Sequence, residues 1–432
     1  MKHLLGLCTL AFFIVQPWDR LVADSIWLAL SAVSFSYIVS LKIRKKNLKT
    51  PKQLKNLLWL LAIMPLLSIT SYFLSPLNTL TPSLLEPDTR WLLITPIILA
   101  MRASNMNSTW VLVQLAGYAL SAFAVALAQT DMTHNLHIRA EGDENAVSFG
   151  MFNATIAIML LALLMSPYYK QFTNSTVVKL CLRTTILTVC ALAIIAVALS
   201  GTRAALLLLP IAMTVLYGLY YNPKKALLGA TVLISIGTLA FQLSPNSAMK
   251  EKLQHSHTNT INYFVIGDKQ SKLTSMGQRL EQWKESWCIF TKHPILGTGP
   301  RSFKYGHQAY GGQSHCNATQ YLEKGSYQAH SLYFNTLATL GVLGAIAMIT
   351  LFAMSLKLAI STIKNRHASP ESLTGALLLI SVIVAHGING LTLDLLFKNY
   401  MMDKFLLIWA LSIVLIFSLN SSKLIKSEKS TV

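Results

Sequence analysis

A polar run that opens as SPNSAMKEKLQHSHTNT (residues 244–260) and closes near Gln328 decides how the rest of this chain folds. The run contains SMGQRLEQWKESWCIF (275–290), and the chain leaves it through QAHSLYFNTLATLGVLG (328–344). On both sides the sequence is one apolar segment after another. Polar sequence of this length between apolar segments indicates a folded loop outside a membrane.

The composition is that of a membrane protein. Of 432 residues, 53% are hydrophobic and only 12% are charged, and the mean hydropathy is +0.49. That is too little polar surface to cover a soluble protein of this size. The net charge of +19 lies mostly beside the ends of apolar runs, so it indicates a membrane and not nucleic acid.

We therefore predict an all-α polytopic membrane protein with about 12 transmembrane helices, because a bilayer core of ~30 Å needs ~20 apolar residues per crossing. The first run, Met1–Val15, is either a short span or a signal sequence. The other spans are expected at 22–41, 57–74, 91–101, 109–128, 147–165, 184–200, 204–221, 226–243, 330–356, 373–392 and 403–420.

Charge in the connecting loops sets the orientation. KIRKKNLKTPKQLK (42–55) carries seven Lys or Arg and no acid, so this loop is predicted to be cytoplasmic. Alternation then places the polar run in the periplasm and both termini in the cytoplasm. The expected divisions are 1–243 with nine spans, 244–328 as a periplasmic loop with an amphipathic helix, and 329–432 with three spans and a short cytoplasmic tail.

Polar residues are sparse within the expected spans, and no span shows an interruption repeated in two halves of the chain. Both observations weigh against an ion-coupled transporter. Within the periplasmic loop, Cys288 and Cys316 either pair as a disulfide or remain separate, since sequence alone does not give their distance.

Arg203 lies in SGTRAALLLL (200–209), at the outward turn between two expected spans. A guanidinium at this position can hold phosphate oxygens with two parallel hydrogen bonds and stays charged. The alternative is an interfacial anchor that reaches water.

Arg279 lies in an expected amphipathic helix at the membrane surface. From that helix it can point at a lipid headgroup, or it can form a salt bridge with Glu281 or Glu285. The apolar stripe of the helix consists of Leu280, Trp283, Trp287 and Phe290.

His330 stands at the start of a long apolar segment. The positive end of a helix and nearby arginines disfavour the imidazolium, and a neutral ring can accept a proton. The alternative is a hydrogen-bonded interfacial histidine.

Together these three side chains suit a sugar donor on a lipid diphosphate. Its leaving group needs positive charge and no protonation, while the incoming hydroxyl needs one base. An alternative source of positive charge is a divalent cation held by Glu141, Asp143 and Glu144 in RAEGDEN, although a solvated acidic loop also explains that cluster. Zinc-type spacings, phosphate-binding glycine loops and serine-nucleophile motifs are absent from the sequence.

The chain resembles bacterial O-antigen ligases, a superfamily that also contains O-antigen polymerases and some protein O-oligosaccharyltransferases. The resemblance spans essentially the whole chain. It depends on the number of spans, the late periplasmic loop, and four motifs: TRAALLLL with Arg203, SxGxR with Arg279, the HPILGTGP turn, and AHS with His330 followed by Gly341 and Gly344.

The resemblance implies a metal- and ATP-independent inverting glycosyltransferase in the bacterial inner membrane, without a cofactor. Glycan would pass from undecaprenyl diphosphate to the lipid A core oligosaccharide, with Arg203 and Arg279 on the diphosphate and His330 as base or orienting group. Asp394 in NGLTLDLLF is the nearest match to an acidic residue near the outer end of the penultimate span, and Arg139 is a second additional candidate.

Three other activities remain open from the sequence. A polymerase or a protein O-oligosaccharyltransferase would use the same donor with another acceptor. A lipid-linked sugar flippase would also need outward arginines, but it requires a polar passage, which the sparse polar residues of the spans argue against.

Overall fold

The computed structural model describes residues 1–45, 49–77, 80–130, 139–168, 175–227, 261–265, 269–306, 328–394 and 399–418, with positions 229 and 258. In this part of the chain the longer elements are α1 (Lys2–Val15), α2 (Arg20–Ile43), α3 (Lys52–Phe73), η1 (Pro82–Asp88), α4 (Thr89–Ala103), α5 (Ser108–Gln129), α6 (Ala146–Met165), α7 (Thr176–Leu199), α8 (Arg203–Tyr220), α12 (Ser275–Lys292), α14 (Leu332–Lys364), α15 (Pro370–Asn389) and α16 (Asn399–Ile416). Two short helices, α11 (Lys269–Lys272) and α13 (Phe303–Gly306), flank α12 in sequence. Every regular element among the described residues is a helix, which confirms the all-α prediction.

Eight of these helices are long and apolar enough to cross a membrane: α2, α3, α5, α6, α7, α8, α14 and α15. The chain is therefore a multi-pass membrane protein, and the expected total of about 12 spans stays a prediction. Most of the expected span at 226–243, the C-terminal tail and Cys316 lie outside the described residues. Cys288 is disulfide-bonded, and its pairing with Cys316, one of the two alternatives left open by the sequence, lies outside the described residues.

Several helices begin at a residue whose side chain accepts hydrogen bonds from the first, unpaired amides of the helix. Asp19 accepts hydrogen bonds from the backbone amides of Leu21 and Val22 at the start of α2. Asn145 accepts one from Ser148 at the start of α6. Such side chains satisfy amides that have no partner within the helix, so they mark where these two apolar segments begin.

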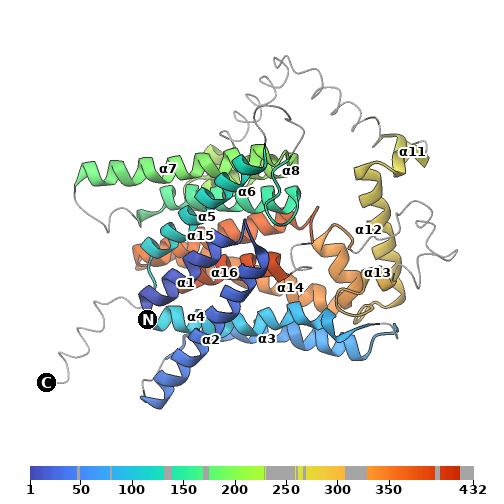
Figure 1. The fold of residues 1–432 in the computed structure, drawn as a ribbon, viewed down its shortest axis with the longest axis horizontal. Helices are drawn as coiled ribbons and strands as arrows, with labels where there is room; N and C mark the ends of the chain where they lie inside the picture. The colour runs from blue at the N-terminus through green and yellow to red at the C-terminus, as the bar shows by residue number, and fades with distance from the viewer. Residues whose placement is uncertain are drawn as a thin grey trace.

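The long helices lie roughly side by side, and α12 crosses their ends at the right of Figure 1. Helix α15 packs against α6, α14 and α16 in the interior. Every side chain of α16 from Tyr400 to Ile416 is buried. Charged residues on α16 are therefore enclosed by protein.

One end of this bundle gathers the elements that carry the expected site. The amide of Leu332, at the start of α14, donates to the carbonyl oxygen of Gly390, at the end of α15, over 2.8 Å. The Thr202 hydroxyl, just before α8, donates to the carbonyl oxygen of Ala146, at the start of α6, over 2.8 Å. The starts of α6 and α16 are also joined at this end, by an ion pair described below.

Helix α14 is broken at Gly341, which has φ 64° and ψ −163°. This backbone region is essentially restricted to glycine. A Cβ atom at Gly341 would also lie 2.3 Å from the carbonyl oxygen of Ile295. The expected uninterrupted span at 330–356 is wrong in this respect, because α14 consists of two helical pieces that run on to Lys364.

The loop 293–300 forms hydrogen bonds with the backbone groups that the break in α14 leaves unpaired. Backbone amides of Val342 and Leu343 donate to the carbonyl oxygens of Pro294 and Ile295, over 2.8 and 3.3 Å. The loop also donates to the helical piece before Gly341. The Thr298 amide donates to the carbonyl oxygen of Ala338 over 3.1 Å, and the Gly299 amide donates to that of Thr339 over 2.9 Å. Within a membrane, irregular backbone is tolerated where protein satisfies it in this way. HPILGTGP is thus a turn, as expected, and its backbone also supplies hydrogen-bond partners to α14 at the break.

Candidate active site

The turn that carries His330 is clamped between two helices. The amide just before His330 donates to Asn335 Oδ1, one turn into α14, over 3.3 Å. On the other side, the Ser331 hydroxyl donates to the carbonyl oxygen of Gly390 over 3.2 Å. His330 itself has φ 48°, a left-handed conformation that is uncommon for a residue with a side chain. The surrounding hydrogen bonds therefore hold the histidine in one backbone orientation, directly before the positive end of α14.

Arg203 is the first residue of α8, and its side chain is exposed. The turn before it contains Gly201 with φ 62°. Arg139 braces this turn, donating from Nε to the carbonyl oxygen of Ser200 over 2.8 Å and from Nη2 to Thr202 Oγ1 over 3.2 Å. The predicted interhelical turn is confirmed, and the structure brings Arg139 and Arg203 to the same place.

Arg279 lies in the first turns of α12, so the expected helix is confirmed. Its side chain is half-buried, and burial lowers the pKa of the guanidinium from its ordinary high value. Four residues further on, Trp283 stacks on Phe334 with ring centroids 5.3 Å apart and ring planes at 12°. Because the loop after α12 then reaches the break in α14, the two segments run in the same direction. Arg279 lies one turn before Trp283 in α12, and His330 lies four residues before Phe334, just ahead of the start of α14.

The glycine of the SxGxR motif permits this packing. A Cβ atom at Gly277 would lie 2.1 Å from the carbonyl oxygen of Ser271, in the segment just before α12. The hydroxyl of Thr274 accepts a hydrogen bond from the Gly277 amide over 3.1 Å and caps the helix. The motif thus fixes where α12 begins, and with it the position of Arg279.

The face that α12 turns toward the protein contains two glutamates. Its acidic side chains face the protein, with Glu281 and Glu285 only 1% and 0% exposed, while Trp287 of the apolar stripe is 52% exposed. Tyr263 donates to Glu281 Oε1 over 2.7 Å; burial, followed by this hydrogen bond, raises the pKa of the tyrosine. Neither glutamate forms the salt bridge with Arg279 that was the alternative for this arginine, and within the described residues Arg279 has no ion pair.

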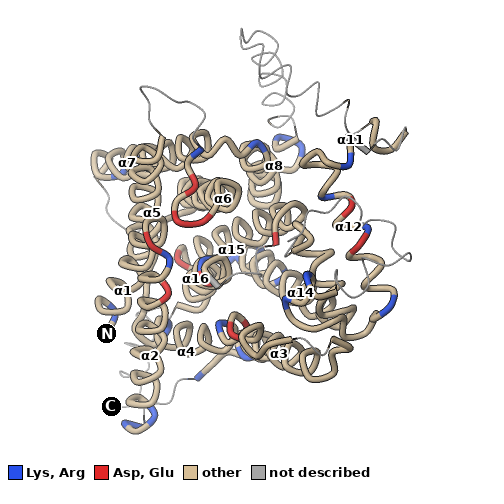
Figure 2. Tube along the Cα trace, turned by 45° about the vertical axis from the view of Figure 1, so that its right-hand side comes forward, with Lys and Arg blue, Asp and Glu red and all other residues tan. Residues whose placement is uncertain are grey.

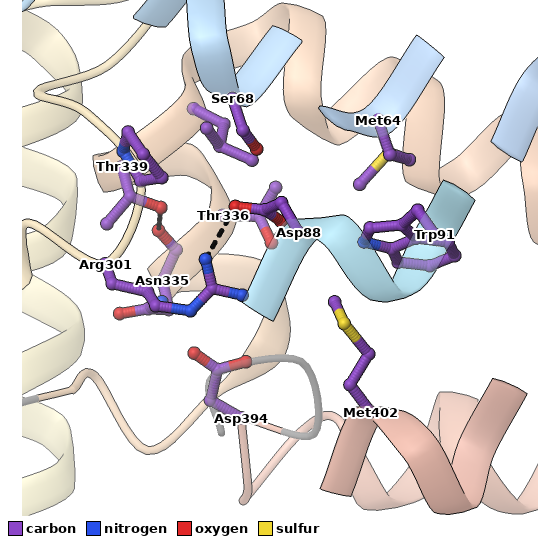
Figure 3. Close-up of a pocket in the computed structure, with 12 residues that line it drawn as sticks. Met64, Ser68, Asp88, Trp91, Arg301, Asn335, Thr336, Thr339, Asp394 and Met402 are labelled. Carbon is purple, nitrogen blue, oxygen red and sulfur yellow. Dashed lines mark hydrogen bonds and ion pairs between the residues drawn. The ribbon is translucent and has the colours of Figure 1, made fainter. Parts of the chain in front are cut away.

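Asp394 lines a polar cavity of about 40 Å³ (Figure 3), together with Asn335, which accepts the hydrogen bond from the turn that carries His330. Arg301 and Asp88 close one side of it, with Arg301 Nη1 2.6 Å from Asp88 Oδ2. Figure 3 shows the Asp394 carboxylate on the far side of the Arg301 guanidinium from Asp88. The rest of the lining comes from α3, α4, α14 and α16 and from the loop before Arg301: Met64, Ser68, Trp91, Pro300, Asn335, Thr336, Thr339, Leu340 and Met402.

Sequence reasoning missed Arg301. It directly follows HPILGTGP, has φ 53°, and donates from Nη1 to the carbonyl oxygen of Leu84 over 2.9 Å as well as to Asp88. In the sequence, Arg301 was visible only as an arginine directly after a glycine-rich turn. The conformation of that turn could not be predicted from the sequence. The Asp88 side chain that Arg301 pairs with is only 9% exposed.

Two further groups of buried charges were also missed. Arg90 lies between Asp24 and Asp403, with nitrogen–oxygen distances of 3.8 and 3.5 Å. Lys404 Nζ lies 2.6 Å from Glu144 Oε1. Figure 2 shows acidic residues beside α6 and α16 in the body of the protein. Arg90, Asp403 and Lys404 are buried, and they lie at the ends of the expected spans 91–101 and 403–420.

The acidic cluster RAEGDEN is solvated in part: Glu141 is exposed and the Asp143 side chain is 41% exposed, whereas the Glu144 side chain is 1% exposed. Glu144 is buried against Lys404, and Asp143 accepts a hydrogen bond from the Arg20 amide over 2.9 Å. Two of the three carboxylates therefore connect helices. Among the residues that the structure describes, no group of three or more His, Cys, Asp or Glu side chains is placed to hold a metal ion.

The fold and this end of the bundle define a multi-pass membrane protein with arginines and a histidine gathered on one side. Residues 188–349 match the family model described as O-Antigen ligase. The chain is also similar to a curated protein of Haemophilus influenzae described as uncharacterized, with 27% identity over 161 residues. That similarity covers 37% of this chain and 39% of the relative, so the chain spans well under half of that protein. The segment that matches this family model contains Arg203, Arg279 and His330 but neither Arg139 nor Asp394.

Proposed function

We propose that this protein is an inverting glycosyltransferase of lipopolysaccharide biosynthesis, which transfers O-antigen glycan from undecaprenyl diphosphate to the lipid A core oligosaccharide at the periplasmic face of the inner membrane. The observation that supports the proposal is that Arg203, Arg279 and His330 lie on elements at one end of the bundle, within the segment that matches the O-antigen ligase family model. The predicted orientation places this end in the periplasm, where no ATP is available and none is needed.

In the proposed reaction, a hydroxyl oxygen of the acceptor sugar attacks the anomeric carbon of the donor. The bond from that carbon to the diphosphate oxygen breaks, and its electron pair stays on the diphosphate. The hydroxyl proton moves to a ring nitrogen of His330. Attack from the side opposite the leaving group inverts the anomeric configuration.

The arginines supply the charge that this leaving group requires. Arg203 is exposed at the start of α8, and Arg279 has no ion pair in the described part of the chain, so both can form hydrogen bonds with phosphate oxygens. Arg139, which is hydrogen-bonded to the turn before Arg203, acts as a positioning residue. Asp394, in the cavity that Asn335 also lines, is proposed to orient the acceptor hydroxyls.

One observation favours a flippase as the second candidate. Interrupted helices are common in transporters, and α14 is interrupted at Gly341. The loop 293–300 fills this interruption with reciprocal backbone hydrogen bonds, which argues for a fixed structural element instead of a passage. A polymerase with the same donor remains the nearest alternative, because the two enzymes differ in their acceptor.

Reconstitution of the full-length protein with defined substrates tests the proposal. Vesicles containing undecaprenyl-diphosphate-linked glycan and lipid A core are expected to yield glycan covalently attached to the core, detected as a mass increase of the core lipid. Formation of longer lipid-linked glycan with an unmodified core would identify a polymerase. Movement of donor across the bilayer without a new covalent product would identify a flippase.

A further inference from the structure

A second cavity, of about 390 Å³, lies between α3 and α14, which pack side by side (Figure 1). Its lining combines amide, hydroxyl and ammonium groups with aliphatic side chains. The seven lining residues are Gln53, Asn56, Leu57, Met354, Lys357, Leu358 and Ser361. None of them belongs to the site described above.

The cavity lies at the opposite end of both helices from the histidine turn. At the other end of α3, the Ser71 hydroxyl donates to the carbonyl oxygens of Leu296 and Thr339 beside the break in α14. From Gln53 to Ser71 a helix rises ~27 Å, which is close to the ~30 Å hydrocarbon thickness of a bilayer. The cavity therefore lies at the level of the lipid headgroups on the side away from His330.

The lining matches the two chemical parts of a phospholipid. Gln53, Asn56, Lys357 and Ser361 are exposed and present hydrogen-bond donors for a headgroup. The aliphatic members of the lining are more buried, with Leu57 and Leu358 only 2% and 6% exposed, and they present a surface for an acyl chain. This arrangement would be matched poorly by a small soluble anion, which has no apolar part.

Charge favours an anionic headgroup over a zwitterionic one. Lys357 is the charged member of the lining, and none of the seven residues is acidic. The neighbouring sequence 42–55 carries seven basic residues and no acid. Glu371, which begins the next helix, is already hydrogen-bonded to the Ser108 amide over 3.0 Å and to the Ser108 hydroxyl. The ammonium of a zwitterionic headgroup would thus find no carboxylate in the cavity, while a phosphate would find Lys357.

We propose that the cavity between α3 and α14 binds one anionic phospholipid of the surrounding bilayer. The headgroup phosphate lies against Lys357 and the amides of Gln53 and Asn56, and an acyl chain follows the aliphatic side chains toward the membrane centre. The binding site is separate from the proposed glycan transfer and does not depend on it.

Native mass spectrometry of the full-length protein, released from nanodiscs of equal phosphatidylglycerol and phosphatidylethanolamine content, tests this assignment. Phosphatidylglycerol is expected to be retained at least about fivefold more than phosphatidylethanolamine. Both phosphates can bind Lys357, but only the phosphatidylethanolamine headgroup also carries an ammonium, for which the cavity has no carboxylate. Equal retention of the two lipids would overturn the proposal.

Three variants separate this site from general attraction to the bilayer. Lys357→Gln removes the cation and Asn56→Trp fills the cavity without changing charge, and each is expected to abolish the preference for phosphatidylglycerol. Lys364→Gln, two turns further along α14 and outside the lining, is the matched control and should keep it. An unchanged preference in Lys357→Gln or Asn56→Trp, or an equal loss in Lys364→Gln, would contradict the proposal.

Thermal unfolding in detergent provides an independent measurement. Added phosphatidylglycerol should raise the melting temperature of the wild-type protein and not that of folded Lys357→Gln. Inorganic phosphate at the same concentration should have no effect. A rise with phosphate equal to that with the lipid would show an ion site instead of a lipid site.

Discussion

Lys404 Nζ lies 2.6 Å from Glu144 Oε1, and the two side chains are 2% and 1% exposed. The lysine belongs to the first turns of α16, and the glutamate precedes Asn145, which caps α6. The ammonium also lies 4.6 Å from the centre of the Phe152 ring. This pair joins two interior helices at the end of the bundle that carries Arg203 and His330.

Replacing one member of this pair should destabilise the protein strongly. Lys404→Met leaves the Glu144 carboxylate buried without its cation, at an expected cost of about 3–5 kcal/mol in the free energy of unfolding. The double variant Lys404→Met/Glu144→Leu should recover most of that loss, since a buried pair can often be replaced by apolar groups. Reversible unfolding in mixed detergent measures both.

The exposed pair of Arg20 and Asp143 is the matched control. Its side chains are 46% and 41% exposed and 3.8 Å apart. Arg20→Ala should therefore change stability by less than about 1 kcal/mol. Equal effects of Arg20→Ala and Lys404→Met would show that burial does not set the strength of these pairs.

Gly341→Ala should destabilise the protein, because alanine disfavours the backbone conformation that residue 341 adopts at the break in α14. The expected cost is at least about 1–3 kcal/mol from the backbone conformation alone, and the added methyl group would overlap the Ile295 carbonyl. Gly387→Ala in α15 is the control, because a Cβ atom there meets only the Tyr333 hydroxyl, at 3.7 Å. A melting temperature as high in Gly341→Ala as in Gly387→Ala would count against the described break.

His330→Asn should abolish transfer while the fold is retained. Asparagine tolerates the left-handed backbone of residue 330 but is not a useful base at neutral pH, so the rate of glycan transfer should fall by about 10²–10⁴. His330→Ala should show the same loss, and His367→Ala, at an exposed position, should show none. Transfer by folded His330→Asn at the wild-type rate would remove His330 from the mechanism.

Arg203→Lys should reduce transfer by about tenfold or more, because a lysine cannot bind two phosphate oxygens in the parallel manner of a guanidinium. The effect should be absent from Arg366→Lys, an exposed arginine just after α14. Steady-state kinetics with varied donor concentration measures it. Wild-type kinetics in Arg203→Lys would favour a simple membrane anchor at this position.

Chelation of divalent cations should leave the transfer rate within about twofold of its original value. Asp143 and Glu144, which were considered as cation ligands, already bind Arg20 and Lys404, and the arginines supply the charge for the leaving group. The assay compares purified protein with and without a chelator. Loss of activity that added magnesium restores would revive the cation hypothesis.

Local sequence was sufficient to predict the elements that carry the site. The turn at Arg203, the helix around Arg279 and the start of a long helix after His330 follow from apolar runs, capping residues and glycine, all of which act within a few residues. The direction in which α12 faces was not predictable in the same way. Its exposed Trp287 and buried Glu285 depend on Tyr263, Phe334 and the rest of the surface against which it packs.

The sequence by itself determined that this is an all-helical membrane protein, and it singled out the residues of the proposed site. Those properties come from hydrophobicity summed over ~20 residues and from motifs that are contiguous in the chain. Only the tertiary structure decided that α14 is broken and completed by 293–300, that Arg301 pairs with Asp88, and that Lys404 is buried against Glu144. These features join residues far apart in sequence, and buried polar groups are stable only when such distant partners satisfy them.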